Sequence, residues 1–547
     1  MDVLSGSSGT PDVVDFLHAT VLSPKGLLSL VVSIAVILLV TEAYRANFPK
    51  IQGIPEVPGA LPFVGHLHKL GGRTGENDAT VFSAWSKQLR TNVFQCVLGN
   101  QRTVVVEDWA TMKHLWVSQA NALIDRPHQP GFVDKLGIDL TGSCMTDQVR
   151  KCRTAGMRAL GKPNWHKYYH LLEPSSGKFV RDMYRRSLAG SSADGSTPPV
   201  DTYAYLRQIV FDLGLSLTYG ARFGEVDDDF MLTFIKSING ISSLRSSTRI
   251  YRHFVPLLRM LPESTNATMA AERVRRRHRD VLYNRYLERV RAGETVDCIV
   301  AALHEDKLTE DEVHGTCLSL LQAAPDTVAS GTYMAIAWLA SPEGRATQAV
   351  AYQAILDAYD GDRTRAWQMA FREEKVPLIT SLYKETLRFF TLTPYATPRR
   401  TVADVTLPNG VVLPRGITLI MNAQAVDHDV AHFGDDAWQF RPDRYLDPGR
   451  TEAAGLPHVA FGAGSRICPA VNISNRIIYA LVTRLLLAFE MDNSTDPARA
   501  PIMDAIRFSD TANALVAHPR FYDCHFKVRD AAWLEATLAA EESATMA

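Results

Sequence analysis

The segment that most constrains this chain is the loop from Phe461 to Ala470 (FGAGSRICPA), which holds two glycines, an arginine and a cysteine. Glycines allow a backbone to turn sharply and to approach a flat group closely. Apolar residues four apart, from Ile473 to Leu485, predict a helix directly after the loop. Cys468 therefore lies just before a helix N-terminus, where amide donors and the helix dipole favour a thiolate. Taken alone, the loop fits a buried structural cysteine as well as a reactive or ligating one.

Two charged motifs precede this loop. Glu385 and Arg388 are three residues apart and share one face of a predicted helix, a spacing that is also common in surface ion pairs. The segment from Phe440 to Tyr445 (FRPDRY) follows further along the chain and carries Arg444. Neither motif is specific by itself, so their order relative to the cysteine loop is the informative observation.

An acid and a threonine stand side by side at Asp326 and Thr327, inside a long stretch, residues 311–340, with helical periodicity. Pro325 precedes them, removes one backbone hydrogen bond and should distort the helix locally. A distorted core helix is the structural interpretation of these residues, and a proton-transfer site is the functional one.

In this order, the motifs resemble those of the cytochrome P-450 superfamily, whose haem loop reads F-G-x-G-x-R-x-C. The resemblance implies a mainly α prism with small β-sheets and a b-type haem between two long helices. It implies that Cys468 is the axial iron ligand. The other cofactor-binding residues that it implies are Phe461 against the thiolate side of the haem, Gly462 and Gly464 shaping the loop, and Arg466 on a propionate.

The resemblance also assigns the remaining motifs. Glu385, Arg388 and Arg444 correspond to a structural triad beneath the haem loop, and Asp326 with Thr327 to the catalytic pair that relays protons. Arg399 corresponds to a second propionate-binding arginine. The family has a tryptophan where Thr146 stands here, and Arg150 is our choice for the propionate contact that normally follows it.

Three departures from the family pattern leave alternatives open. Lys151 and Arg153 compete with Arg150 for the propionate, and all three are candidates for a positive surface that docks an acidic electron donor. Ala470 replaces a family glycine and adds one methyl group next to the haem. Ala324 and Pro325 replace the usual residues before the acid–threonine pair.

Composition and cysteine usage narrow the setting. The chain has 547 residues, 46% of them hydrophobic, and a net charge of −1, so no overall field favours nucleic acid. Its seven cysteines show no CxxC pair, which argues against a disulfide framework or a zinc ribbon and suits a reducing compartment.

The N-terminal region predicts a membrane anchor. Residues 26–41 form an uncharged run that needs residues up to 44 to approach the roughly 20 required for a bilayer crossing. A cleaved signal peptide is the alternative, but the run starts late and acidic residues precede it. Arg45 and Lys50 follow the run, which predicts a lumenal segment 1–25, a single-pass anchor 26–44 in the endoplasmic reticulum membrane, and a cytosolic body.

The rest of the chain reads as one domain. Closely spaced prolines predict a stiff hinge over 45–72, followed by a monooxygenase domain over 73–535 and a C-terminal tail over 536–547. Residues 92–107 alternate around a Gly-Asn turn and predict a β-hairpin. The arginine-rich run 273–279 is interpreted as a solvated helix face.

The implied reaction is oxygen insertion by a monooxygenase. No G-x-G-x-x-G follows a predicted strand, so the electrons from NADPH must come through a separate protein, for which a diflavin reductase is expected. The motif variants resemble the fungal branch that hydroxylates small aromatics such as phenylacetates, m-cresol and m-hydroxybenzyl alcohol. We expect a small phenolic of a secondary-metabolite polyketide pathway, with phenylacetate catabolism as the alternative.

The substrate pocket is expected to include residues 126–142, 320–324, 393–396 and 514–516, with His128 as a contact to a phenol. Two other classes remain open. One is a haem-thiolate isomerase or dehydratase without a reductase, against which Asp326 and Thr327 argue. The other is a non-catalytic haem-binding membrane protein.

Overall fold

The structure is a computed structural model of the whole chain. It describes residues 24–128, 137–189, 198–221, 232–237, 240, 251–260, 266–447, 456–494, 496–509, 511–512 and 515–546. The predicted lumenal segment 1–25 therefore lies almost entirely outside the described residues.

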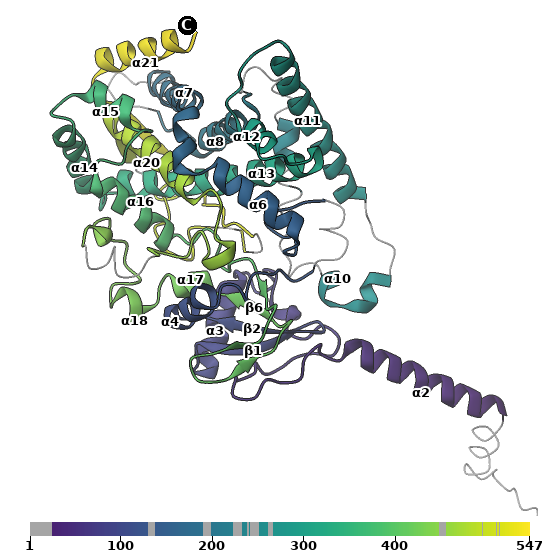
Figure 1. Ribbon diagram of the computed structural model, residues 1–547. Coiled ribbons are helices and arrows are strands. Elements are labelled where there is room, and N and C mark those ends of the chain that lie inside the picture. The colour runs from purple at the N-terminus through teal and green to yellow at the C-terminus, as the bar shows by residue number, and fades with distance from the viewer. Residues whose placement is uncertain are drawn as a thin grey trace, which may run out of the picture.

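Helices make up most of the body, as predicted (Figure 1). The longer ones are α2 (Pro24–Tyr44), α3 (Asp78–Leu89), α6 (Asp147–Ala159), α7 (Tyr169–Leu188), α8 (Thr202–Tyr219), α11 (Asn266–Arg291), α13 (Glu310–Ala340), α14 (Arg345–Ala358), α16 (Pro377–Phe389), α20 (Val471–Ala488) and α21 (Ala531–Met546). The short ones are α4 (Trp109–Met112), α10 (Tyr251–Phe254), α12 (Ile299–Glu305), α15 (Arg363–Met369), α17 (Ala423–Val426) and α18 (Val430–Phe433).

Small sheets flank this helical body. The strands are β1 (Val93–Leu98), β2 (Gln101–Val106), β3 (Arg399–Arg400), β4 (Val405–Thr406), β5 (Val412–Leu413), β6 (Thr418–Met421), β7 (Phe489–Asn493) and β8 (Cys524–Val528). The main sheet has the order β1-β2-β6-β3, with β2 and β6 parallel and the other pairs antiparallel. The hairpin predicted over 92–107 is confirmed as β1 and β2.

The largest core surrounds α13, which packs closely on α8, α16 and α20. A Cβ atom placed on Gly214 of α8 would lie 3.0 Å from Leu321 Cδ1 of α13, and one on Gly331 of α13 would lie 3.1 Å from Leu387 Cδ2 of α16. Glycine at these two positions therefore lets the helices approach closely. The helix predicted over 311–340 is confirmed as α13.

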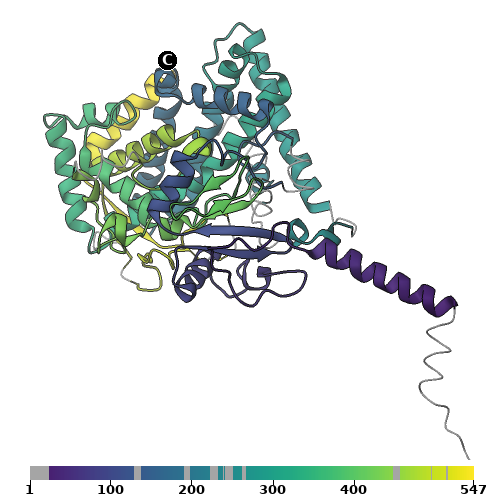
Figure 2. The ribbon, with the colours of Figure 1, turned by 60° about the horizontal axis from the view of Figure 1, so that its bottom comes forward.

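The N-terminal helix α2 projects away from the body (Figures 1 and 2). Its apolar part, Pro24–Leu38, is exposed along most of its length and is shorter than a full span. Among the described residues, α20 passes the length and composition test for a membrane span, but 83% of it is buried inside the body. It is therefore a core helix.

The buried side chain of Gln95 helps to hold the hinge 45–72 against the sheet. The amide of Gln95, on β1, donates to Ile51 O at 2.8 Å and Ile54 O at 2.6 Å, and its carbonyl accepts from Ile51 N at 3.0 Å. Arg102 also donates to the Gln95 carbonyl at 2.9 Å. These hydrogen bonds fix the orientation of the segment after α2 relative to the body.

The C-terminus is part of the packed body. Residues 536–546, which the sequence analysis set aside as a tail, continue helix α21, where Leu538 is buried. Glu541 of α21 lies 2.9 Å from Arg484 near the C-terminal end of α20, and the Arg484 side chain is 1% exposed. The apolar spacing of α21 is weak, which is why sequence periodicity missed its packing.

The arginine-rich run 273–279 is only partly solvated, so the interpretation as a solvated face is wrong for two of its residues. Arg275 and His278 are buried. Glu272, also buried, accepts from Arg275 and Arg276 at 2.7 Å each. An acid within one helical turn makes the burial of Arg275 tolerable.

We expect Gln95→Ala to lower the free energy of unfolding by about 3 kcal/mol, because it leaves several buried backbone groups without partners. Urea unfolding of the purified protein measures this change. Gln52→Ala, at an exposed position of the same hinge, is the control and should change stability little. Equal stability of the two variants would show that the hinge is not held by Gln95.

Candidate haem site

The cysteine loop is closed by its own backbone. The amide of Cys468 donates to Phe461 O at 2.9 Å, which folds the segment between them into a tight turn. Gly462 and Gly464 have φ of +71° and +63°, a conformation that favours glycine. A Cβ atom on Gly464 would also lie 1.7 Å from Trp116 O, so no other residue fits there.

Cys468 lies half-buried immediately before α20, as predicted. Burial raises the pKa of its thiol, while the amide of Ala470 and the guanidinium of Arg153 lower it. Ala470 has φ of −97°, which any residue adopts, so the backbone does not require the glycine that the family places there.

Four buried arginines gather beside this loop. They are Arg126, Arg153, Arg399 and Arg466, each less than 7% exposed. Their hydrogen bonds go to backbone carbonyls: Arg126 to Thr397 and Pro398, Arg153 to Ile467, Arg399 to Leu123 and Ala463, and Arg466 to Ile124, Leu140 and Ser143. Among the described residues, no carboxylate lies within ion-pair distance of any of the four.

This arrangement of like charges is costly without an anion. Burial and the neighbouring guanidiniums lower the pKa of Arg399 to about 9 and that of Arg466 to about 10. The Nε atoms of Arg153 and Arg466 are buried without a hydrogen-bond partner. Two carboxylates placed among these side chains would supply both the missing charge and the missing acceptors. The residues therefore fit the two propionates of a haem, and Cys468, the predicted iron ligand, lies in the loop beside them.

Arg153, and not Arg150, reaches this cluster. Arg150 is exposed, and Lys151 pairs with Glu312 at 2.7 Å. The sequence contained a signal for this choice, because Arg153 falls on the buried stripe of α6 with Val149 and Cys152. The predicted contact through Arg150 is corrected accordingly. Thr146, at the position of the family's tryptophan, caps the helix by accepting from the Val149 amide.

Arg126 was expected from the sequence to line the substrate pocket, but not to join the arginine cluster beside the cysteine loop. It lies on an irregular segment far from the cysteine in the chain, and no local pattern distinguishes it from a surface arginine. Arg399 and Arg466, to which the resemblance assigns the propionates, both belong to the cluster, and Arg399 donates to the cysteine loop itself, at Ala463 O (2.9 Å).

Arg153→Gln should lower haem retention several-fold, because it removes a buried cation that faces the cofactor carboxylates. Haem content per protein after gel filtration, measured as the pyridine haemochrome, gives the readout. Arg150→Gln makes the same chemical change three residues away on the exposed face and should retain haem as the native protein does. Equal loss in both variants would remove Arg153 from the propionate site.

The predicted triad is present and fully buried. Glu385 accepts from Arg388 at 2.7 and 2.8 Å and from Arg444 Nε at 3.0 Å. Neither Glu385 nor Arg388 is exposed at all, and Arg444 is 2% exposed. Burial opposes the charge of Arg388, but the Glu385 carboxylate outweighs it and raises the pKa of that guanidinium.

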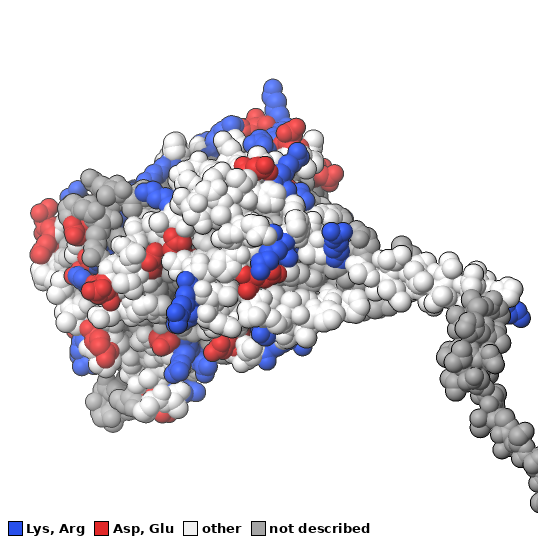
Figure 3. Space-filling model, turned by 90° about the horizontal axis from the view of Figure 1, so that it is seen from below, with Lys and Arg blue, Asp and Glu red and all other residues white. Residues whose placement is uncertain are grey.

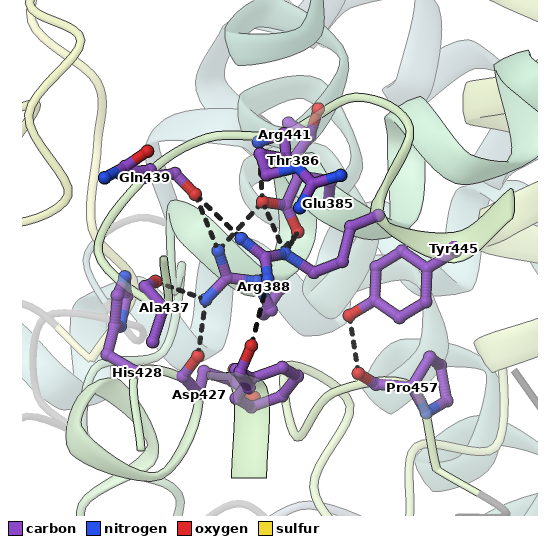
Figure 4. Close-up of polar contacts among 12 residues, drawn as sticks. Glu385, Thr386, Arg388, Asp427, His428, Ala437, Gln439, Arg441, Tyr445 and Pro457 are labelled. Carbon is purple, nitrogen blue, oxygen red and sulfur yellow. Dashed lines mark hydrogen bonds and ion pairs between the residues drawn. The ribbon is translucent and has the colours of Figure 1, made fainter. Parts of the chain in front are cut away.

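The triad connects to the haem loop through Asp427 (Figure 4). Arg388 donates to the carbonyls of Asp427, Ala437 and Gln439. The carboxylate of Asp427 in turn accepts from the Val459 amide at 2.8 Å, just before the haem loop. Burial raises the pKa of this carboxyl well above its usual range. Triad and loop are thus one hydrogen-bonded unit.

One stripe of α13 is open although most of the helix is buried. Ala323 is exposed, and Leu320, Ala324 and Thr327 are half-buried. These positions follow the i, i+3, i+4, i+7 spacing of a single helix face. Thr327 therefore belongs to an accessible face, and its hydroxyl donates to Ala323 O at 2.8 Å. Asp326 points elsewhere: it is buried and lies 3.1 Å from Arg207 of α8.

A pocket that is partly open to solvent adjoins the arginine cluster at Arg126. Its apolar lining includes Phe82, Leu98, Phe254, Tyr395 and Ile420, and its polar lining includes Gln101, Thr103, His128, His253 and Thr418. Of the residues expected from the sequence, Arg126, Pro127, His128, Gly142 and Tyr395 line it. Residues 320–324 and 515–516 do not line this pocket, and Ala514 lies outside the described residues.

Comparisons with known proteins identify the family. The family model described as Cytochrome P450 matches residues 55–510. The chain is 33% identical to phenylacetate 2-hydroxylase of Emericella nidulans, over 94% of this chain and 98% of that protein. It is 27% identical to 3-hydroxyphenylacetate 6-hydroxylase of the same organism, over 89% of this chain and 91% of that protein. A zebra fish cytochrome P450 structure with abiraterone shares the fold, with a TM-score of 0.64 and 19% identity over 83% of this chain and 100% of that one.

Proposed function

We propose that this chain, which belongs to the cytochrome P450 family, hydroxylates the aromatic ring of a small aryl acetate. The family makes it a haem-thiolate monooxygenase with a separate redox partner. The bound haem supplies the activation of O₂ by two electrons and two protons, so that one oxygen atom enters a C–H bond and the other leaves as water. The assignment of a small aryl acetate as the substrate is our proposal.

The observation that carries the aryl acetate assignment is the extent of the match to phenylacetate 2-hydroxylase, which spans nearly both chains. The pocket supports it, because apolar residues such as Phe82 and Ile420 suit a ring, while His128 and Gln101 suit a carboxylate. The phenolic substrate expected from the sequence would use the same polar residues and is included in the test below.

We assign the site residues as follows. Cys468 is the axial ligand, Phe461 packs beside it, and Gly462 and Gly464 shape the loop. Arg126, Arg153, Arg399 and Arg466 bind the propionates, and the triad of Glu385, Arg388 and Arg444 holds the loop in place. Asp326 and Thr327 serve proton delivery.

We also propose that α2 anchors the enzyme in the endoplasmic reticulum membrane. Apolar residues are exposed on the body. They are Leu61 and Phe63 of the hinge, and Leu257 and Met260 of the 3-10 helix η5 (Pro256–Met260), the element that contacts α2. Charged side chains are sparse where the body meets α2 (Figure 3). Arg150 and Lys151, exposed or half-exposed on α6, fit the docking of an acidic diflavin reductase.

Cys468→Ser should abolish the red-shifted Soret band of the ferrous carbon monoxide complex, because an alcohol does not replace a thiolate ligand. Absorption spectra of the purified protein give the readout. Cys144→Ser, at another half-buried cysteine, is the matched control and should keep the band. A normal band in Cys468→Ser would rule out this cysteine as the ligand.

The substrate is tested by incubating microsomes that carry the chain and its reductase with phenylacetate, 3-hydroxyphenylacetate, m-cresol and m-hydroxybenzyl alcohol. Mass spectrometry with isotopically labelled O₂ should show one labelled oxygen atom in the product from an aryl acetate. Microsomes with Cys468→Ser are the control. Products from the phenols alone would overturn the aryl acetate assignment and favour the phenolic one.

A further inference from the structure

Two polar contacts join α8 to α13. Both involve buried residues of α13 rather than the accessible stripe of Leu320, Ala323, Ala324 and Thr327. Tyr203 OH lies 3.0 Å from Ser330 Oγ, and Arg207 Nη2 lies 3.1 Å from Asp326 Oδ1. The two residues on each helix are four apart, so they share one helix face and the contacts are one turn apart. We call these four residues the α8–α13 ladder.

The contact between Arg207 and Asp326 fixes the position of the Asp326 side chain. Its side chain is 8% exposed, and a buried carboxylate is costly unless a cation or hydrogen-bond donors face it. Arg207 supplies that cation, and its guanidinium is itself held over the ring of Tyr203, 5.9 Å from the ring centre. The position of the Asp326 carboxylate therefore depends on both residues of α8.

The contact between Tyr203 and Ser330 continues to a histidine that is partly exposed to solvent. Nδ1 of His518 lies 3.2 Å from Tyr203 OH, and His518 is half-buried, whereas Ser330 is fully buried. An imidazole is the side chain best suited to exchange protons with water near neutral pH. A hydroxyl between an imidazole and a buried serine can accept a proton on one side as it donates on the other.

We propose that protons reach Asp326 along this ladder: His518 takes a proton from solvent, Tyr203 and Ser330 pass it inward, and Arg207 positions Asp326 to receive it. Each hydroxyl gains one proton as it loses another, so no net charge remains on Tyr203 or Ser330, and both hydroxyls rotate back before the next transfer. Ser330 and Asp326 lie one turn apart on the same face of α13, with about 5–6 Å expected between their Cβ atoms, and the last transfer of the proposed route would run through a water hydrogen-bonded between Ser330 Oγ and the Asp326 carboxylate. The inference rests on the monooxygenase reaction of the proposed function but not on its substrate.

The first test compares Tyr203→Phe with Tyr333→Phe. Tyr333 stacks against Tyr203 with ring centres 5.0 Å apart and also loses a buried hydroxyl, but that hydroxyl bonds Tyr522 and lies off the ladder. With holoenzyme and reductase, Tyr203→Phe should form several-fold less product per NADPH, release more hydrogen peroxide and show a larger solvent isotope effect, at unchanged KM. Tyr333→Phe should behave as the native enzyme. Native coupling in Tyr203→Phe, or equal loss in both variants, would overturn the proposal.

The second test examines Arg207 as a positioning residue. The infrared difference between native protein and Asp326→Asn, with labelled aspartate, isolates the Asp326 carboxylate band without any turnover. Arg207→Gln should shift this band and uncouple the reaction, and Arg207→Lys should restore both in part. An unshifted band in Arg207→Gln would overturn the assignment.

The two proposals fail in different ways. Coupling can be measured with any compound that the enzyme hydroxylates, so inactivity on aryl acetates alone would overturn the substrate and leave the ladder standing. Native coupling and solvent isotope effect in His518→Gln would overturn the entry point of the route, whatever the substrate proves to be.

Discussion

The rest of the structure depends on the carboxylate of Glu385, which is held between the guanidiniums of Arg388 and Arg444 with none of its surface exposed. A buried charge trio of this kind is stable only because the remaining donors find backbone carbonyls and, for Arg444, also the carboxylate of Asp436. Those carbonyls belong to the irregular segment after α17, which has little regular structure of its own to fix it. Through Asp427, the same network reaches the backbone that presents Cys468. The buried triad thus determines the conformation of the cysteine loop, which the sequence of the loop alone does not fix.

The molecule contains a second set of buried arginines. The two sets differ in how their charge is neutralised, and this difference indicates which set faces a cofactor. In the triad the protein supplies its own anion. Around Arg126, Arg153, Arg399 and Arg466 it supplies backbone carbonyls, and the described chain places no carboxylate in ion-pair contact. Burial and mutual repulsion lower the pKa of these side chains, so their charge is tolerated best with a bound dianion. Protein stability and cofactor binding are therefore coupled at this cluster.

Much of the site could be predicted because its parts are local in sequence. Cys468 stands in a loop whose glycines carry the signal, Glu385 and Arg388 share one helix, and β1 and β2 are joined by a short turn. Arg126 and Arg207 could not be predicted, because their roles arise when segments distant in the chain meet. Arg153 is an intermediate case. Its place on the apolar stripe of α6 could have been predicted from the sequence, but the resemblance to the family favoured Arg150. The helix α21 was missed because its apolar spacing is weak.

The ion pair between Glu541 and Arg484 has a consequence for the helix that follows the cysteine loop. Helix α20 has Cys468 directly before its first turn and Arg484 near its last, and the acid that neutralises Arg484 belongs to a different helix, α21. Without that acid, Arg484 would be a cation in an apolar setting. The position of α20, and with it the start of the helix at the cysteine loop, therefore depends on α21, which contacts the far end of α20 through this ion pair.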